Sequence, residues 1–139
     1  THSRFVPFYI VSPQYEIDHP KAPHWARRQL GSMDIHHILK HSIPEKYVDV
    51  MKVPCHTPLQ VLQETDSPVD GPERVDVLLV DAEGFDADIV HAFMDLPSFQ
   101  PAMIVYERKH IRQDVYDKLA ARLSMMNYTH WSFEGNAVA

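Results

Sequence analysis

Carboxylate side chains follow two short apolar runs of this sequence, a pattern that can produce a reactive site. Asp81 and Glu83 come directly after residues 75–80, five of which are apolar, and Glu107 comes directly after residues 103–106. Continuous runs of this length are typical of strands buried on both faces of a parallel sheet. Ligands of open α/β sheets bind at the carboxyl ends of such strands. If the two strands are neighbours, the three carboxylates converge at one edge of the sheet.

The three carboxylates allow several kinds of chemistry. Their oxygens could hold a divalent cation, for which Mg²⁺ is the first expectation. They could instead take the proton from a substrate hydroxyl, or hydrogen-bond a substrate or a cofactor. In the structural alternative, Glu83 and Glu107 are charges at helix N-termini, or they pair with Arg108 and Lys109. The residue pattern leaves these alternatives open.

Two histidines lie four residues apart in a predicted short helix, residues 32–41. His37 and His41 would therefore share one face of that helix. Zinc sites need a third protein ligand, and the sequence contains no HExxH pattern. We therefore assign His37 and His41 as candidate substrate contacts, with a plain surface position as the alternative, and assign neither as a metal ligand. A divalent metal is compatible with the sequence, although no motif supports one.

Length and composition restrict the class of protein. A chain of 139 residues with 45% apolar and 23% charged residues is expected to form a globular domain with a core. The net charge of −6 disfavours nucleic acid or an anionic membrane as a partner. Cys55 is the single cysteine, which fits a reducing compartment such as the cytoplasm. We interpret it as a small buried thiol rather than as part of a catalytic dyad with His56.

The elements that must position these residues follow from hydrophobic periodicity and from turn residues. Residues 12–31 contain three prolines and are predicted to be an irregular loop. Residues 134–136 have turn chemistry, so the last two strands should form an antiparallel hairpin. This order of elements predicts an α/β protein with an antiparallel edge strand. Strands are predicted at residues 5–11, 47–53, 75–80, 103–106, 128–133 and 136–139, and helices at 32–41, from 57 onwards, at 85–94 and at 115–126.

Residues 75–86, VDVLLVDAEGFD, resemble the D-x-E-G segment of FkbM-type S-adenosylmethionine-dependent methyltransferases. Further segments resemble the same family in the same order: residues 32–41, residues 101–107, and residues 127–128 with 136–139. The resemblance implies a partial Rossmann-like class I methyltransferase sheet, mostly parallel with an antiparallel edge strand. It also implies transfer of a methyl group from S-adenosylmethionine to oxygen on a small molecule or sugar.

The resemblance also suggests which residues act. Asp81, Glu83 and Glu107 carry over by motif match as catalytic candidates, but the match does not assign their individual roles. We interpret Asp81 as a contact to the cofactor or to the substrate hydroxyl, and Glu107 as a contact to the substrate or to a metal. The helix that contains His37 and His41 carries over more weakly, as a lid or a substrate wall. The family's glycine-rich first turn has no counterpart, so we expect residues 1–139 to be a single domain, the C-terminal part of a methyltransferase domain whose N-terminal cofactor-binding half is missing. The expected partners are a small-molecule or glycan acceptor and a second copy of the chain. The alternative is a non-catalytic α/β binding or interaction domain.

Overall fold

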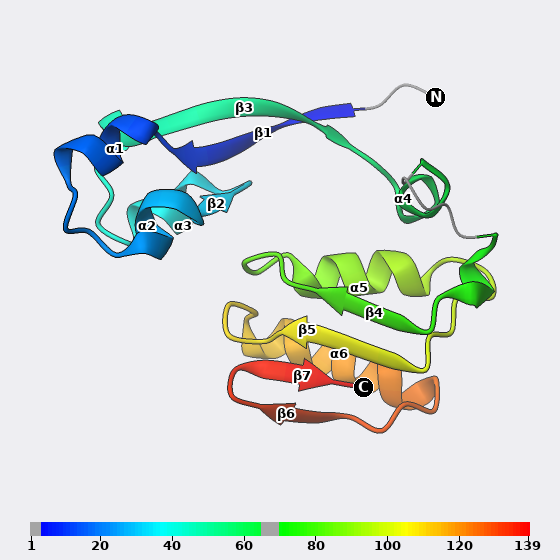
Figure 1. The fold of residues 1–139 in the computed structure, drawn as a ribbon. Coiled ribbons are helices and arrows are strands. Elements are labelled where there is room, and N and C mark those ends of the chain that lie inside the picture. Colours follow the sequence, from blue (N-terminus) through cyan, green and yellow to red (C-terminus); the bar gives the residue numbers. More distant parts are fainter. Residues whose placement is uncertain (1–3, 65–69) are drawn as a thin grey trace. The chain divides into compact units, whose positions relative to one another are not determined.

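The chain folds into two compact units, residues 1–55 (unit 1) and residues 56–139 (unit 2). The computed structural model describes residues 4–64 and 70–139, and Figure 1 shows their helices and strands. Each unit has its own cluster of buried side chains, around Ile38 in unit 1 and around Ile104 in unit 2. That the chain is the C-terminal part of one methyltransferase domain stays a prediction.

Unit 1 is built on an antiparallel sheet with the strand order β2-β1-β3. The long strands β1 (Arg4–Val11) and β3 (Val48–Cys55) pair over their whole length. The short strand β2 (Gly31–Ser32) pairs with Tyr9 and Ile10 at the far end of β1. The predicted strands at residues 5–11 and 47–53 are therefore confirmed.

The segment between β1 and β3 is largely helical, so the irregular loop predicted for residues 12–31 is wrong. Two of the three prolines in residues 12–31 lie at helix starts, and Pro20 lies in a turn between two helices. A proline is tolerated at a helix start because the N–H that it lacks would have no helical partner there. Pro13 lies in the first turn of one helix, and Pro23 is the N-cap residue of the next. The helical elements of unit 1 are α1 (Pro13–Asp18), α2 (His24–Arg28), α3 (Ile35–Leu39) and the 3₁₀ turn η1 (Glu45–Tyr47).

Unit 2 contains a mixed sheet with the strand order β4-β5-β7-β6. Its strands are β4 (Val77–Val80), β5 (Met103–Glu107), β6 (Trp131–Phe133) and β7 (Asn136–Val138). β4 and β5 are parallel, whereas β7 runs antiparallel to both β5 and β6. The expected mostly parallel Rossmann-like sheet is therefore wrong: the sheet of unit 1 is antiparallel, most pairings in unit 2 are antiparallel, and the reversed strand is interior, not at an edge.

A tight turn explains this topology. Glu134 and Gly135 have φ angles of 46° and 86°, the left-handed conformation that a two-residue hairpin turn requires. The turn folds β7 back onto β6, and the carbonyl of Gly135 accepts hydrogen bonds from the N–H groups of Arg108 and Lys109 at 2.7 and 3.1 Å. This attachment to the segment after β5 lets β7 insert between β5 and β6.

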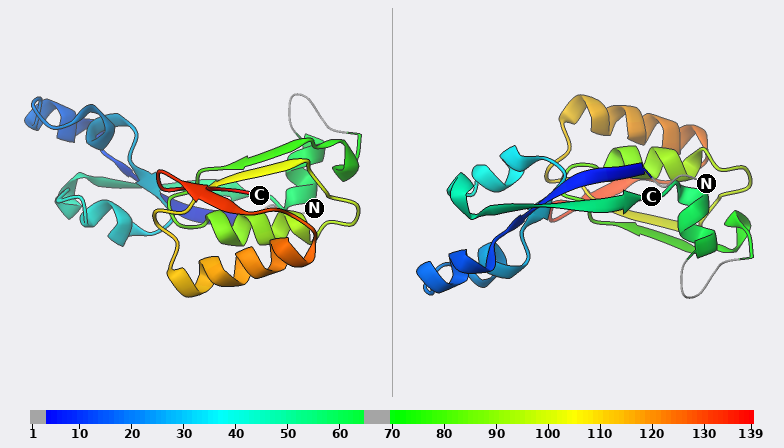
Figure 2. Two further views of the ribbon diagram at one scale, coloured as in Figure 1. Left: turned by 90° about the horizontal axis from the view of Figure 1, so that it is seen from below. Right: turned by 90° about the horizontal axis from the view of Figure 1, so that it is seen from above.

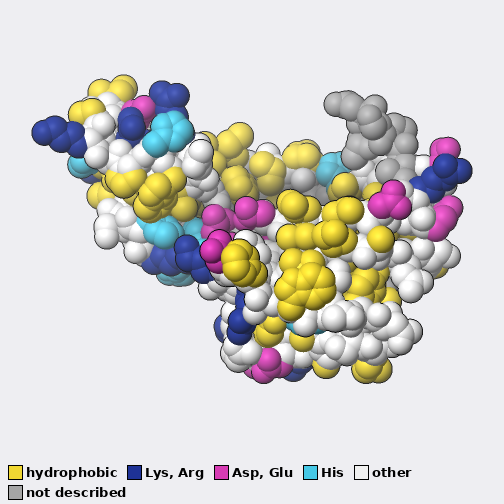
Figure 3. Space-filling model, turned by 60° about the horizontal axis from the view of Figure 1, so that its bottom comes forward, with side chains coloured by type: hydrophobic (Ala, Val, Ile, Leu, Met, Phe, Trp, Pro, Cys, Tyr) yellow, Lys and Arg dark blue, Asp and Glu magenta, His cyan; other side chains and the backbone are white. Residues whose placement is uncertain are grey.

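Two helices of unit 2, α5 (Asp86–Met94) and α6 (Gln113–Met125), cover one face of its sheet. Figure 2 shows α5 and α6 on the same side of the strands, where Leu78 and Tyr106 are buried against them. On the opposite face Val77 and Leu79 are 52% and 70% exposed, so the expectation that this strand is buried on both faces is wrong. Figure 3 shows exposed hydrophobic side chains gathered on this unit. The helical elements are α4 (Pro58–Glu64), the 3₁₀ turn η2 (Pro72–Arg74), α5 (Asp86–Met94) and α6 (Gln113–Met125).

The longest described helix is α6, with 13 residues. Within residues 4–64 and 70–139, no helix combines the length and the apolar composition that a membrane-spanning helix needs.

Candidate functional site

The carboxyl ends of β4 and β5 bring Glu83, Glu107 and His110 together. Because the two strands are parallel neighbours, with Val80 opposite Tyr106, the residues that follow them lie at one edge of the sheet. His110 Nε2 lies 3.4 Å from Glu83 Oε2 and 3.9 Å from Glu107 Oε2. One side-chain oxygen or nitrogen from each residue lies within 4.8 Å of those of the other two. We call these three residues the strand-end cluster.

A buried aspartate joins the two backbone segments that carry the cluster. Asp86, the first residue of α5, is fully buried. Its Oδ1 accepts hydrogen bonds from the N–H groups of Ala82 and Glu107, at 3.3 and 3.1 Å, and its Oδ2 accepts one from Gly84 at 3.1 Å. The turn after β4 is thereby tied to the end of β5, which fixes Glu83 relative to Glu107.

The turn after β4 has a backbone conformation that few side chains adopt. Glu83 and Gly84 have φ angles of 50° and 104°, and the N–H of Phe85 donates to the carbonyl of Ala82 at 3.1 Å. The left-handed region is unfavourable for a residue with a Cβ. A Cβ added at Gly84 would lie 3.3 Å from the carbonyl oxygen of His110. The glycine therefore makes room for the loop that carries His110.

The electrostatic interactions within the strand-end cluster act mainly on Glu107. Burial raises the pKa of this carboxyl, and the charges of Glu83, Asp81 and Asp86 raise it further, while His110 opposes the shift. Glu107 Oε2 is buried and accepts no hydrogen bond from the described residues. Carboxylates this close repel each other unless a positive group lies beside them, and the His110 imidazole is close enough to both to be that group when protonated.

The other residues predicted at this edge lie outside the cluster. Asp81 follows β4 directly and is exposed to solvent. Arg108, an alternative partner proposed for the carboxylates, donates to Gln113 Oε1 at 2.9 Å, and its guanidinium lies 4.2 Å from the centre of the Tyr116 ring. Asp81 therefore faces solvent at this edge of the sheet, and its charge still contributes to the raised pKa of Glu107.

His37 and His41 belong to unit 1. Asp34 is the N-cap of α3, and its side chain accepts a hydrogen bond from the N–H of His36 at 2.9 Å. The rings of His37 and His41 lie 5.3 Å apart, which confirms their shared face, and His41 also contacts the Trp25 ring at 5.1 Å. His37 is buried and His41 is half-buried. Their contact with a substrate stays a prediction.

His110 and Asp86 are the residues of the candidate site that the sequence reasoning does not single out. His110 follows Glu107 by three residues, and Asp86 follows Gly84 by two. The sequence feature that could have identified both residues is their position, because each lies in the segment that follows the carboxyl end of a predicted strand. What brings His110 to Glu83 is the close approach of its loop to the turn at Gly84, which a linear pattern does not encode.

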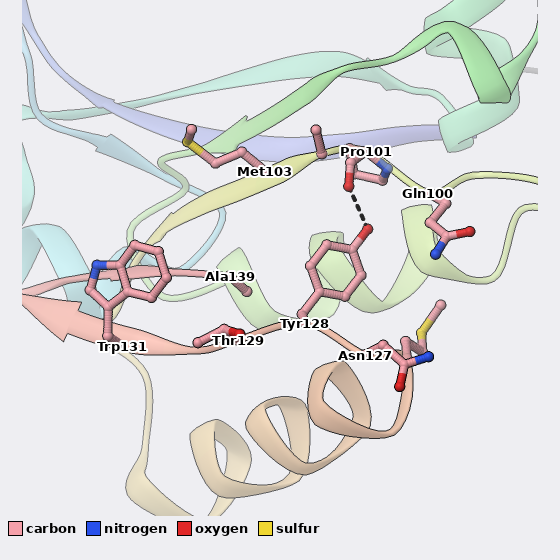
Figure 4. A pocket seen from close by; sticks show the side chains of 10 residues that line it. Gln100, Pro101, Met103, Asn127, Tyr128, Thr129, Trp131 and Ala139 are labelled. Carbon is pink, nitrogen blue, oxygen red and sulfur yellow. Dashed lines mark hydrogen bonds between the residues drawn. The ribbon is translucent and has the colours of Figure 1, made fainter.

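A separate cavity of about 470 Å³ lies at the opposite end of β5, next to Met103 (Figure 4). Tyr128 and Trp131 line it, and the Tyr128 hydroxyl donates to the carbonyl of Pro101 at 2.6 Å. None of its lining residues is charged. The cavity therefore offers surface for a ligand but no charged side chain, and we place the candidate chemistry at the strand-end cluster.

Comparison with known proteins gives no family for this chain: no family model matches it, and neither a curated protein nor a solved structure matches it significantly. The likeness to FkbM-type methyltransferases rests on the residues quoted above and stays a prediction.

Proposed function

We propose that this chain carries the acceptor-binding part of an S-adenosylmethionine-dependent methyltransferase that acts on oxygen of a small molecule or sugar. The observation that carries the proposal is the convergence of Glu83, Glu107 and His110 at the carboxyl ends of two parallel strands. This edge is where open α/β sheets bind ligands. The segments that resemble FkbM-type enzymes support the same assignment.

The residues are assigned to proton removal from the acceptor. A hydroxyl oxygen must lose its proton when it gains a methyl group, and a positioned carboxylate is a suitable general base. We assign Asp81, exposed at the rim, to accept that proton or to contact the cofactor. Glu83 and Glu107 hold the acceptor hydroxyl or the group that binds it. His37 and His41 remain the proposed substrate contacts of unit 1.

We infer that the described residues contribute little to the binding of S-adenosylmethionine, because their glycines are isolated in the sequence. A site for this cofactor needs a glycine-rich turn that lets the backbone approach it. At Gly84, beside the cluster, the space that a Cβ would fill is bounded by the backbone of His110 and is not open to a ligand. We therefore derive no step through the cofactor, and Asp81 remains its single proposed contact in this chain.

A non-catalytic α/β binding or interaction domain is the second candidate function. The misfit to the cofactor favours it, as do the exposed hydrophobic residues Leu79, Trp131 and Phe133. Under either function we propose a cytoplasmic protein, from the single cysteine, with a homo-oligomer as a further proposal. The net charge of −6 favours a small molecule or glycan over nucleic acid as the ligand.

A methylation assay on the protein that contains this chain tests the proposal. The protein is incubated with methyl-labelled S-adenosylmethionine and a panel of hydroxylated small molecules and sugars, and label in the acceptor is counted. We expect a labelled product whose rate falls about 10²-fold or more in Glu107→Gln. The exposed Glu73, at the other end of β4, provides the matched control Glu73→Gln, which should retain the full rate. Equal rates in both variants would refute the assignment, and no product with any acceptor would favour the binding domain.

A further inference from the structure

We infer that Glu83, Glu107 and His110 bind a divalent transition-metal ion such as Mn²⁺ or Zn²⁺. The inference of cation binding comes from the structure of the cluster and does not depend on the proposed function. The role of the cation in binding an acceptor hydroxyl deepens the proposed function, and this role rests on that function.

The separations within the cluster are close to those of a metal site. Bonds of about 2.0–2.2 Å to nitrogen and oxygen place neighbouring tetrahedral ligands about 3.3–3.6 Å apart. His110 Nε2 and Glu83 Oε2 are already 3.4 Å apart, and His110 Nε2 and Glu107 Oε2 are 3.9 Å apart. All three ligand atoms lie within 4.8 Å of one another. Side-chain rotations that move these atoms by about 1 Å would therefore bring them to the spacing of metal ligands.

The histidine determines which metals fit. Carboxylates alone suit Mg²⁺ and Ca²⁺, whereas an imidazole nitrogen favours borderline ions such as Zn²⁺. Two carboxylates with one imidazole therefore favour Mn²⁺ or Zn²⁺ over the Mg²⁺ that the carboxylates alone predict. A set of three protein ligands leaves at least one coordination position open, as in catalytic zinc sites. An acceptor hydroxyl bound there would lose its proton more readily, because a bound cation lowers the pKa of a coordinated oxygen.

Two further observations support the site. Glu107 Oε2 is buried and accepts no hydrogen bond from the described residues, with His110 Nε2 at 3.9 Å, so a cation would give this oxygen a direct partner. Asp86 holds both ligand-bearing backbone segments through three hydrogen bonds. The ligands therefore come from a supported framework, which is what metal sites require of their surroundings.

Titration with Mn²⁺, followed by the electron paramagnetic resonance signal of the free ion, tests the inference on the chain itself. We expect one Mn²⁺ per chain, displaced by Zn²⁺ more readily than by Mg²⁺. Glu83→Gly is the most informative variant, because it removes a ligand and also relieves the left-handed conformation at φ 50°, so it should fold at least as well as the wild type. Glu83→Gly and His110→Gln should each bind Mn²⁺ at least about tenfold more weakly. The exposed residues Glu73 and His24 provide the controls Glu73→Gln and His24→Gln, which should bind like the wild type.

Two results would overturn the inference: no binding at millimolar Mn²⁺, or binding that the ligand variants leave unchanged. The methylation assay, repeated with EDTA, separates this inference from the proposed function. Product formation that EDTA leaves unchanged would refute the role of the cation and retain the methyltransferase. Mn²⁺ binding that the Glu83→Gly and His110→Gln variants weaken, without methylated product from any acceptor, would retain the cation site and refute the methyltransferase.

Discussion

Replacement of Asp86 by asparagine should destabilise unit 2 measurably. With its amide oxygen at the Oδ1 position, asparagine still accepts from Ala82 and Glu107, but its NH₂ group then faces the N–H of Gly84. Two donors cannot bond to each other, and an unsatisfied donor in a buried position costs about 1–3 kcal/mol. We therefore expect Asp86→Asn to lower the free energy of unfolding by about 2 kcal/mol, and Asp86→Ala, which loses all three bonds, by about 3–6 kcal/mol.

Urea denaturation followed by circular dichroism provides the measurement. A loss of about 2 kcal/mol lowers the urea midpoint by about 1–2 M for a small protein. Asp88 is the matched control, since it is an exposed aspartate in the same first turn of α5. Asp88→Asn should change the unfolding free energy by less than about 0.5 kcal/mol. Because Asp86 supports the ligand-bearing segments, Asp86→Asn should also weaken Mn²⁺ binding by about tenfold.

The reasoning about Asp86 would be refuted if Asp86→Asn were as stable as Asp88→Asn. A stable variant that also bound Mn²⁺ like the wild type would show that the turn after β4 holds its shape without this residue.

Three further predictions follow from single residues and from the cofactor. Asp81→Asn should lower the methylation rate about 10²- to 10⁴-fold and change the unfolding free energy by less than about 0.5 kcal/mol; a destabilised but fully active variant would leave Asp81 a charge at a helix N-terminus. Calorimetric titration of residues 1–139 with S-adenosylmethionine should show little heat, and micromolar binding would contradict the misfit argued above. Burial and the charge of Arg108 hold the pKa of His130 below its ordinary value of 6.5. The folded state therefore binds this proton less readily than the unfolded chain, so stability should fall as the pH drops below about 6.5 and level off below the folded pKa. The urea midpoint of the wild type at pH 7.5 should exceed its midpoint at pH 5.5, and this difference should be smaller in His130→Gln. An equal difference in the variant would show that His130 does not cause the pH dependence.

The sequence predicts the local elements of unit 2 well, because their signals are local. The apolar run before Asp81 gives β4, and the run before Glu107 gives β5. Helical periodicity gives α5 and α6, and Pro58 begins α4 as expected for a proline in a first turn. The convergence of Glu83 and Glu107 follows from the parallel pairing of neighbouring strands.

What the sequence does not predict depends on long-range contacts. The insertion of β7 between β5 and β6 depends on Gly135 accepting from Arg108 and Lys109, and a hairpin signal does not specify the strand on its other side. The approach of His110 to Glu83 likewise depends on the packing of one loop against another. Cys55 is exposed at the end of β3, so the expectation of a buried thiol is wrong. A small apolar side chain at a strand end does not by itself reveal which elements cover it.

Anomalous X-ray diffraction from a crystal of this chain grown with Mn²⁺ or Zn²⁺ tests the strand-end cluster most directly. The account predicts a single strong anomalous peak about 2.0–2.2 Å from His110 Nε2 and from one carboxylate oxygen each of Glu83 and Glu107. A peak at other residues, or no peak here while the ion is present in the crystal, would contradict the claim that these three residues form a cation site.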